Sequence, residues 1–271
     1  MPLVIRSLLT LVTAAGFAVA AQLGSTGAAP AAPVDRDAAD VRAAADVGAA
    51  DKKIVRPATL KRTGDGYYFG AWGQSSRLEV TLVDGKLRFR DPRSARWEGL
   101  ARSCTKKRVA TGIAAVCRVP DTVTRTNPLT IHFEMRLGND HVNTSTLPAQ
   151  FHTSILLDAG LDEARTGAGH DFINGAFDRD LLISGAGNDW VRSGEADDRV
   201  FGGAGRDRLV GGEAGDLLRG GDGNDSVEGG PGGDELYGDL GADELKCGDG
   251  NDAAERDPAD TQRFGCERST G

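Results

Sequence analysis

Aromatic residues and long apolar runs are both scarce in this chain of 271 residues. Only 6% of the residues are aromatic, whereas glycine occurs 38 times. Large aromatic side chains supply much of the buried area of a globular core, so their scarcity argues against one large enzyme-like core. No apolar run beyond the N-terminus approaches the ~18 residues of a membrane-spanning helix. We therefore expect no membrane span.

The first 20 residues have the pattern of a secretory signal peptide. Arg6 supplies the positive charge, residues 7–16 are apolar, and Ala18-Val19-Ala20 is a small-residue cleavage site. The stretch is too short and too rich in alanine to favour a membrane anchor. We predict a secreted, extracellular protein that begins at Ala21. Residues 21–50 are mainly Ala, Pro, Asp and Gly and are predicted to be a flexible linker.

Cysteine is rare as well, with four residues in the chain. Four cysteines allow three pairings, and an extracellular protein is expected to oxidise them. We expect Cys104–Cys117 and Cys247–Cys266, because each of these pairs lies in a different part of the chain.

The sequence lacks the motifs of common hydrolases. None of the four histidines forms an H-E-x-x-H pair. Residues 73–77 (GQSSR) lack the closing glycine of G-x-S-x-G. We therefore expect a protein that is not an enzyme.

Residues 51–135 are predicted to be a separate β-rich module, followed by a transition over residues 136–156. Apolar residues alternate over 78–82 and again over 87–89, with Asp84-Gly85 between them, which predicts a β-hairpin. A further strand is expected over 129–135. The aromatic residues Tyr67, Tyr68, Phe69 and Trp72 could bind a glycan, but a small β core explains them more simply.

Charge is unevenly distributed. Residues 157–271 carry 27 acidic and 11 basic side chains, a net charge of −16, whereas residues 1–156 have a net charge of +8. The acidic half must either repel itself or hold cations.

A period of nine residues runs without insertion from 157 to 255, which is 11 repeats. The copy at residues 220–228 (GGDGNDSVE) has the form G-G-x-G-x-D-x-U-x, where U is a large apolar residue. Glycine allows the backbone to turn sharply, and the aspartate at position six offers Ca²⁺ a hard carboxylate oxygen. The apolar residue at position eight is expected to point inward from a short strand.

Every repeat keeps aspartate at position six: Asp162, Asp171, Asp180, Asp189, Asp198, Asp207, Asp216, Asp225, Asp234, Asp243 and Asp252. Position eight is apolar in every repeat, and the smaller alanine stands there only in the first and last copies. Two positions that keep phase for 11 cycles predict a calcium-binding array.

The array resembles the repeats-in-toxin (RTX) β-roll. The resemblance covers residues 157–255, with a weaker extension over residues 137–142, and implies an all-β fold: a right-handed parallel β-roll or β-solenoid. In that family two nonapeptides make one coil, and several calcium ions lie between turns 18 residues apart, held by aspartates and backbone carbonyls. The signal peptide and the lack of a large toxin domain depart from many RTX proteins.

The repeats should alternate between two edges of such a roll. The edge of Asp171, Asp189, Asp207, Asp225 and Asp243 has glycine at every position four, including Gly187, Gly205, Gly223 and Gly241. The other edge has Asp178, Ala196 and Ala214 at that position in three consecutive turns. Non-glycine residues at positive φ are strained. We therefore predict a full row of calcium ions on the first edge and an interrupted row on the second, which recovers only near Asp234 and Asp252.

Calcium is expected to be required for folding. Stacked aspartates repel one another, and each repeat buries only one sizeable apolar side chain against the entropy of ordering nine residues. Residues 256–271 resemble the C-terminal cap of small secreted RTX-like proteins, with Asp257 and Asp260 either solvated or ligands of a last ion.

The sequence leads to two hypotheses about function. The first is a secreted calcium-binding protein that acts as an extracellular scaffold or adhesion module, with calcium and a cell surface or extracellular glycan as partners and no nucleic acid. The alternative is a secreted hydrolase or carbohydrate-acting protein with a small N-terminal catalytic domain and the roll as a calcium-dependent folding clamp.

Overall fold

The computed structural model describes residues 58–71, 75–94, 96–255, 258–260, 262–266 and 268–270. Within these residues the secondary structure is entirely β, in 23 strands. None of the described residues form a helix of the length and apolarity that crossing a membrane requires. The predicted signal peptide (1–20), the predicted linker (21–50), Trp72 and Asp257 lie outside the described residues.

The N-terminal part contains eight strands. They are β1 (Ala58–Arg62), β2 (Gly66–Ala71), β3 (Arg77–Val83), β4 (Lys86–Asp91), β5 (Trp97–Leu100), β6 (Cys104–Lys107), β7 (Ile113–Arg118) and β8 (Leu129–Met135). The predicted hairpin is confirmed as β3 and β4, which pair antiparallel. Its turn residues Asp84 and Gly85 both have positive φ, 50° and 67°, as a two-residue hairpin turn requires.

Shorter strands follow one another from residue 141 to the C-terminus. They are β9 (His141–Asn143), β10 (Phe151–Leu156), β11 (Glu163–Arg165), β12 (Phe172–Ala176), β13 (Leu181–Ala186), β14 (Trp190–Gly194), β15 (Arg199–Ala204), β16 (Arg208–Gly212), β17 (Leu217–Asp222), β18 (Ser226–Gly232), β19 (Glu235–Leu240), β20 (Glu244–Gly250), β21 (Ala253–Glu255), β22 (Gln262–Phe264) and β23 (Arg268–Thr270).

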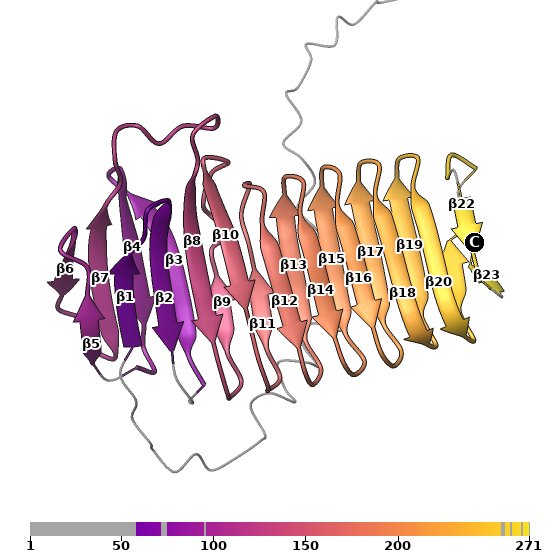
Figure 1. Ribbon diagram of the computed structural model, residues 1–271, viewed down its shortest axis with the longest axis horizontal. Helices are drawn as coiled ribbons and strands as arrows, with labels where there is room; N and C mark the ends of the chain where they lie inside the picture. Colours follow the sequence, from indigo (N-terminus) through magenta and orange to yellow (C-terminus); the bar gives the residue numbers. More distant parts are fainter. Residues whose placement is uncertain are drawn as a thin grey trace, which may run out of the picture. The chain divides into compact units, whose positions relative to one another are not determined.

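The strands form two sheets. Figure 1 shows the strands following one another side by side along the described part of the chain. The first sheet runs in the order β22-β20-β18-β16-β14-β12-β10-β8-β2-β1-β5, and the second in the order β23-β21-β19-β17-β15-β13-β11-β9-β3-β4-β7-β6. From β8 onward successive strands alternate between the sheets, and from β10 onward each strand pairs in parallel with the strand two places earlier. The predicted fold, an all-β parallel β-roll, is confirmed.

The N-terminal strands continue the same two sheets. Strand β2 pairs in parallel with β8, with Tyr67 opposite Ile131, and β3 pairs in parallel with β9, with Leu78 opposite Val142. The N-terminal strands and the roll therefore share both sheets. Coiling begins before residue 157. Strands β1, β4, β6 and β7 extend the two sheets through antiparallel pairing, and β5 pairs in parallel with β1.

Two ladders of apolar side chains, one from each sheet, fill the interior of the roll. The position-eight residues from Ala164 to Ala254 are all at most 1% exposed. They point inward because side chains alternate along a strand, and β-branched and leucine side chains suit a pleated, buried surface. In the N-terminal part the core widens to include Tyr67, Phe69 and Phe89, all fully buried, so Tyr67 and Phe69 serve the β core rather than an exposed glycan site.

Both expected disulfides are present. Cys104–Cys117 joins the paired strands β6 and β7, and Cys247–Cys266 joins β20 to the segment after β22. Each disulfide therefore fastens one end of the stack. Terminal coils of a solenoid have a neighbour on one side only, so a covalent link is most useful there.

Candidate calcium-binding turns

The aspartates of the repeats lie in the turns, each one residue before a strand of the roll. Turns that lead from the second sheet to the first contain Asp171, Asp189, Asp207, Asp225 and Asp243, and we call this row the first edge. Turns that lead from the first sheet to the second contain Asp162, Asp180, Asp198, Asp216, Asp234 and Asp252, and we call this row the second edge. The alternation expected from the repeat is confirmed.

All 11 of these aspartates are buried, with at most 4% of each residue exposed. Each one from Asp180 to Asp252 accepts, through Oδ1, the backbone N–H of the aspartate one coil earlier, at 2.7–2.9 Å. The two rows, which we call the aspartate columns, therefore use one carboxylate oxygen to hold neighbouring coils together.

The other carboxylate oxygen is available for a cation. Among the described residues, the buried Oδ2 atom has no hydrogen-bond partner in Asp140, Asp162, Asp171, Asp180, Asp189, Asp198, Asp207, Asp216, Asp225, Asp234 and Asp252. A buried carboxylate oxygen without a donor is costly. Its repetition once per turn fits a series of Ca²⁺ ions, which prefer carboxylate and carbonyl oxygen ligands.

Glycine at position one makes room for that oxygen. A Cβ added to Gly202, Gly211 or Gly220 would collide with Oδ2 of the aspartate five residues later. The glycine column and the aspartate columns are thus two parts of one arrangement. When bound, calcium would supply the positive charge that these buried oxygens lack.

Few side chains converge on any one point. Within the described ranges, no group of three or more His, Cys, Asp or Glu side chains is placed to hold a metal ion. An ion between coils would therefore take most of its ligands from backbone carbonyls, which Ca²⁺ accepts readily, with aspartate oxygens as the charged ligands.

Burial raises the pKa of nearly every aspartate in the two columns. The pKa of Asp180 rises to about 10, chiefly because the carboxyl is desolvated and also because the charge of Asp162 is close. The pKa values of Asp189 and Asp216 rise to about 8 for the same two kinds of cause. Those of Asp207 and Asp234 rise to about 6, with desolvation as the main cause. Without a cation, burial therefore disfavours the charged form of these carboxyl groups.

The two edges differ in turn conformation. On the first edge Gly187, Gly205, Gly223 and Gly241 have φ values of 134–153°. On the second edge Asp178, Ala196 and Ala214 have φ values of 63–77°, the left-handed region in which a side chain is strained but tolerated. Gly250, near the end of the second edge, returns to 149°.

Strand pairing follows the same division. Strands that lead into a first-edge turn pair with the neighbouring coil up to position three of the repeat, as in Ala186 opposite Ala204. Strands that lead into a second-edge turn pair only up to position two, as in Gly194 opposite Gly212. The pairing extends again from Gly230 to Gly232 in β18. The three turns that lack glycine at position four therefore have the altered backbone shape that the sequence predicts. The aspartate hydrogen bonds are the same on both edges, and calcium occupancy stays a prediction.

Asp140 extends the second edge by one coil. It is 2% exposed, its N–H donates to Oδ1 of Asp162 at 2.7 Å, and its Oδ1 accepts the N–H of Ser76 at 2.5 Å. The weak repeat resemblance over residues 137–142 was the only sequence signal for this residue, because 22 residues rather than 18 separate it from Asp162. On the first edge the corresponding coil has Thr153, whose N–H and hydroxyl both donate to Asp171.

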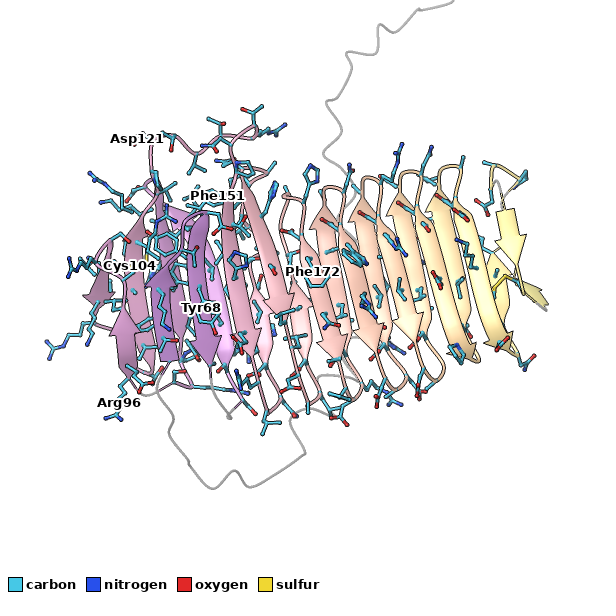
Figure 2. All side chains as sticks on the ribbon, in the orientation of Figure 1. Tyr68, Arg96, Cys104, Asp121, Phe151 and Phe172 are labelled. Carbon is cyan, nitrogen blue, oxygen red and sulfur yellow. A yellow bond between two sulfur atoms is a disulfide. The ribbon has the colours of Figure 1, made fainter. Side chains whose placement is uncertain are left out.

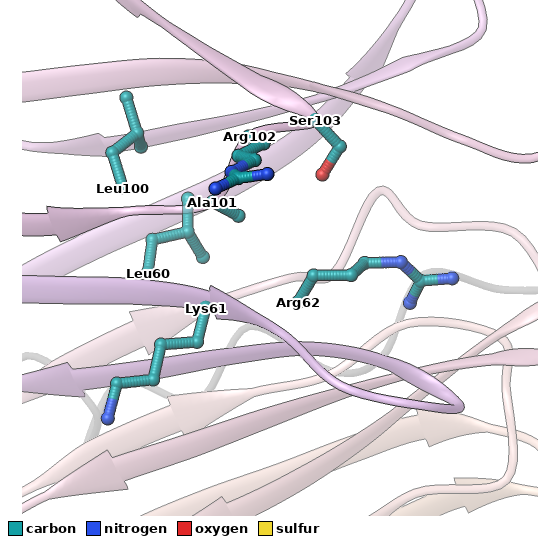
Figure 3. A pocket seen from close by; sticks show the side chains of 7 residues that line it. All are labelled: Leu60, Lys61, Arg62, Leu100, Ala101, Arg102 and Ser103. Carbon is teal, nitrogen blue, oxygen red and sulfur yellow. The ribbon is translucent and has the colours of Figure 1, made fainter.

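A groove of about 610 Å³ lies away from these turns, where β1 meets residues 100–103 (Figure 3). Its floor is apolar, from Leu60, Leu100 and Ala101, and cationic side chains surround it. One of these, Arg62, lies 5.1 Å from the centre of the Tyr67 ring and donates to the Gly66 carbonyl. The groove is not part of the aspartate columns.

Comparison with known families agrees with the geometry of the turns. Residues 157–191, 177–209, 210–245 and 219–253 match the RTX calcium-binding nonapeptide repeat, in four copies. No curated protein and no solved structure matches the chain. Residues 157–253 of this chain are therefore an array of RTX calcium-binding nonapeptide repeats.

Proposed function

We propose that this is a secreted calcium-binding protein whose roll folds when Ca²⁺ binds between stacked turns, and which acts as an extracellular scaffold or adhesion module. The observation that carries the proposal is the row of buried Oδ2 atoms from Asp162 to Asp234 and in Asp252, none of which has a hydrogen-bond donor in the part of the chain described. Burying such a row of carboxylate oxygens is unfavourable without cations. Bound cations would supply the partners that these oxygens lack, so binding would favour folding.

A calcium titration of the full chain tests the folding part of the proposal. Trp190 is a convenient probe, because it is 46% exposed on β14, directly after Asp189 of the first edge. We expect calcium to increase the β signal in circular dichroism and to change Trp190 fluorescence at the same midpoint. Magnesium at equal concentration is the control, since it demands a smaller and more regular site. Identical spectra with calcium and with EGTA would refute the proposal.

We propose further that the first edge holds more calcium than the second. The support is the altered φ of Asp178, Ala196 and Ala214 and the shorter strand pairing at their turns. Counting ions by calorimetry and locating them in a crystal grown with calcium tests this. Equal occupancy of both edges would contradict it.

The adhesion role is supported by a row of outward side chains on the first sheet. Tyr68, His132, Ser154, Phe172, Trp190 and Arg208 lie directly opposite one another across successive strands. The rings of Phe172 and Trp190 are 5.2 Å apart, and Arg208 lies 5.9 Å from the Trp190 ring; Figure 2 labels Tyr68 and Phe172. Exposed aromatic faces suit stacking against sugar rings.

Secretion and the absence of enzymatic activity belong to the same proposal. The N-terminal sequence pattern supports export, and N-terminal sequencing of protein from the culture medium should begin at Ala21. A hydrolase screen of the full, calcium-loaded chain should give no turnover, and turnover would favour the carbohydrate-acting alternative.

A further inference from the structure

The outer surface of the second sheet is strongly basic at its N-terminal end. Six cationic side chains point outward from adjacent strands: Arg77 on β3, Lys86, Arg88 and Arg90 on β4, Lys107 on β6 and Arg118 on β7. All six are exposed. We call this surface the basic face.

The strand register brings these charges close together. Lys86 lies directly opposite Arg118, and Arg90 and Lys107 both lie opposite Ala114. Neighbouring strands are about 4.8 Å apart, and alternate residues of one strand are about 7 Å apart. Like charges directly opposite one another destabilise a sheet, so the folded chain concentrates charge here against a cost.

The basic face has almost no compensating acid. Glu79, opposite Arg90, is the one carboxylate among the outward residues of β3, β4, β6 and β7, and within the described residues none of the six cations has an ion pair. Further along the same sheet, ion pairs are formed: Glu163 pairs with Arg165 at 2.5 Å. The concentration of unpaired cations is therefore local.

Two adjoining hollows lie on the basic face. One, of about 350 Å³, is lined by Arg77, Glu79, Arg90, Pro92, His141 and Asn143. The second, of about 220 Å³, is lined by Glu79, Thr81, Arg88 and Arg90. They share Glu79 and Arg90, so they form one shallow groove across β9, β3 and β4. Its volume is at the lower end of small-ligand sites.

We propose that the basic face binds a linear anionic polysaccharide, with its carboxylate or sulfate groups at the arginines and its hydroxyl groups at Thr81 and Asn143. Guanidinium groups bind planar oxyanions in a bidentate manner. A polymer with repeated charges would engage several cations of a flat sheet at once. The outward residues of β3, β4, β6 and β7 include no aromatic ring, whereas binding of single-stranded nucleic acid relies on stacking.

This inference extends the proposed adhesion role, but its surface lies outside the calcium-binding turns, so the two can fail separately. The test measures binding of fluorescent hyaluronan and heparin oligosaccharides to the full chain in millimolar calcium. The variant R88E/R90E should bind at least about tenfold more weakly, since two attractive charges become repulsive. The neutral variant R88Q/R90Q should lie between it and the wild type.

The matched control is R125E/R192E, which changes the net charge equally at two exposed arginines outside the basic face. It should bind within about twofold of the wild type, while raising the salt concentration should weaken wild-type binding. If hyaluronan binds more strongly than heparin, the groove on the basic face prefers carboxylate groups. If heparin binds more strongly, the groove prefers sulfate groups. The calcium-dependent circular dichroism signal, unchanged in all variants, shows that the roll is intact.

Three outcomes would overturn the inference. The first is that neither oligosaccharide binds, and the second is that R88E/R90E and R125E/R192E bind equally well. The third is that double-stranded DNA, vesicles of anionic lipid or a second copy of the chain binds the wild type more tightly than both oligosaccharides. A lost calcium transition with retained oligosaccharide binding would count against the folding proposal alone.

Discussion

At the scale of single residues, each repeat assigns separate tasks to the two oxygens of one carboxylate. Oδ1 of Asp207 accepts the backbone N–H of Asp189 in the preceding coil, and Oδ2 of Asp207 is buried without a donor among the described residues, as it is in nine other aspartates of the columns. An asparagine would preserve the first task and remove the charge that the second requires. The two tasks can therefore be separated by substitution.

Asp207→Asn should raise the calcium midpoint by about tenfold, because the charge of the ligands sets the affinity of calcium sites. The hydrogen bond from the N–H of Asp189 is expected to persist through the amide oxygen. Asp222→Asn, in the next turn of the same edge but exposed, is the control and should change the midpoint by less than about twofold. The midpoints are read from circular dichroism, and equal shifts would show that net charge alone matters.

Gly223→Ala should destabilise the calcium-loaded roll by about 3 kcal/mol or more. Gly223 has a φ of 152°, and an added Cβ would overlap the carbonyl oxygen of Gly205 in the coil below. Gly233→Ala is the matched control, since its Cβ would meet only the Asn251 carbonyl oxygen at 3.9 Å. Thermal unfolding distinguishes the two, and similar melting temperatures would contradict this account of the turn.

Much of this residue-level pattern could be predicted from the sequence. Position six and position eight each repeat every nine residues. The structure buries position eight as expected, and it buries position six as well. The place of Asp140 could not be predicted with the same force, because its coil contains 22 residues rather than 18 before the next aspartate. The different roles of Oδ1 and Oδ2 depend on the distance between neighbouring coils. A local sequence pattern does not specify this distance, so these roles could not be predicted.

At the scale of elements, the two ends of the stack are closed in different ways. The N-terminal end has the antiparallel strands β6 and β7 joined by Cys104–Cys117, and the C-terminal end has β20 tied to the tail by Cys247–Cys266. Local patterns were sufficient to predict the hairpin and both disulfides. The parallel pairing of β2 with β8 was not predictable, because it joins residues such as Tyr67 and Ile131 that are far apart in the sequence.

Replacing Cys247 and Cys266 by serine should lower the stability of the calcium-loaded protein by about 3 kcal/mol, from a link that spans 19 residues. The loss should concentrate in the last coil, because each coil contacts only its neighbours. Limited proteolysis is expected to cut the variant first near β20 to β22. C104S/C117S is the control for the opposite end, and early cleavage at the same C-terminal site in that variant would contradict a local effect.

At the scale of the whole molecule, protons and calcium ions compete for the same buried oxygens. The pKa values of Asp189 and Asp216 lie at about 8 in the metal-free fold, against an ordinary value of 3.8. Between these values the folded chain holds protons that the unfolded chain has released. The free energy of unfolding of the metal-free protein must therefore fall as pH rises through this window.

We expect the metal-free protein, prepared with a chelating resin, to melt at a higher temperature at pH 5 than at pH 7.5. Calcium should reverse the order, because binding requires the deprotonated carboxylates. Melting curves at several pH values, with and without calcium, provide the measurement. A metal-free melting temperature that increases from pH 5 to pH 7.5 would show that the aspartate columns do not control the pH dependence.

The register of the coils also limits how the gene can lengthen or shorten the roll. Aspartates of one edge are 18 residues apart, so the loss or duplication of 18 residues keeps every remaining turn on its own edge. A change of nine residues would exchange the edges beyond that point and put glycine turns in line with the turns of Ala196 and Ala214. Evolution by whole coils changes the length in steps of about 4.8 Å, whereas evolution by single repeats would mix the two kinds of turn on each edge.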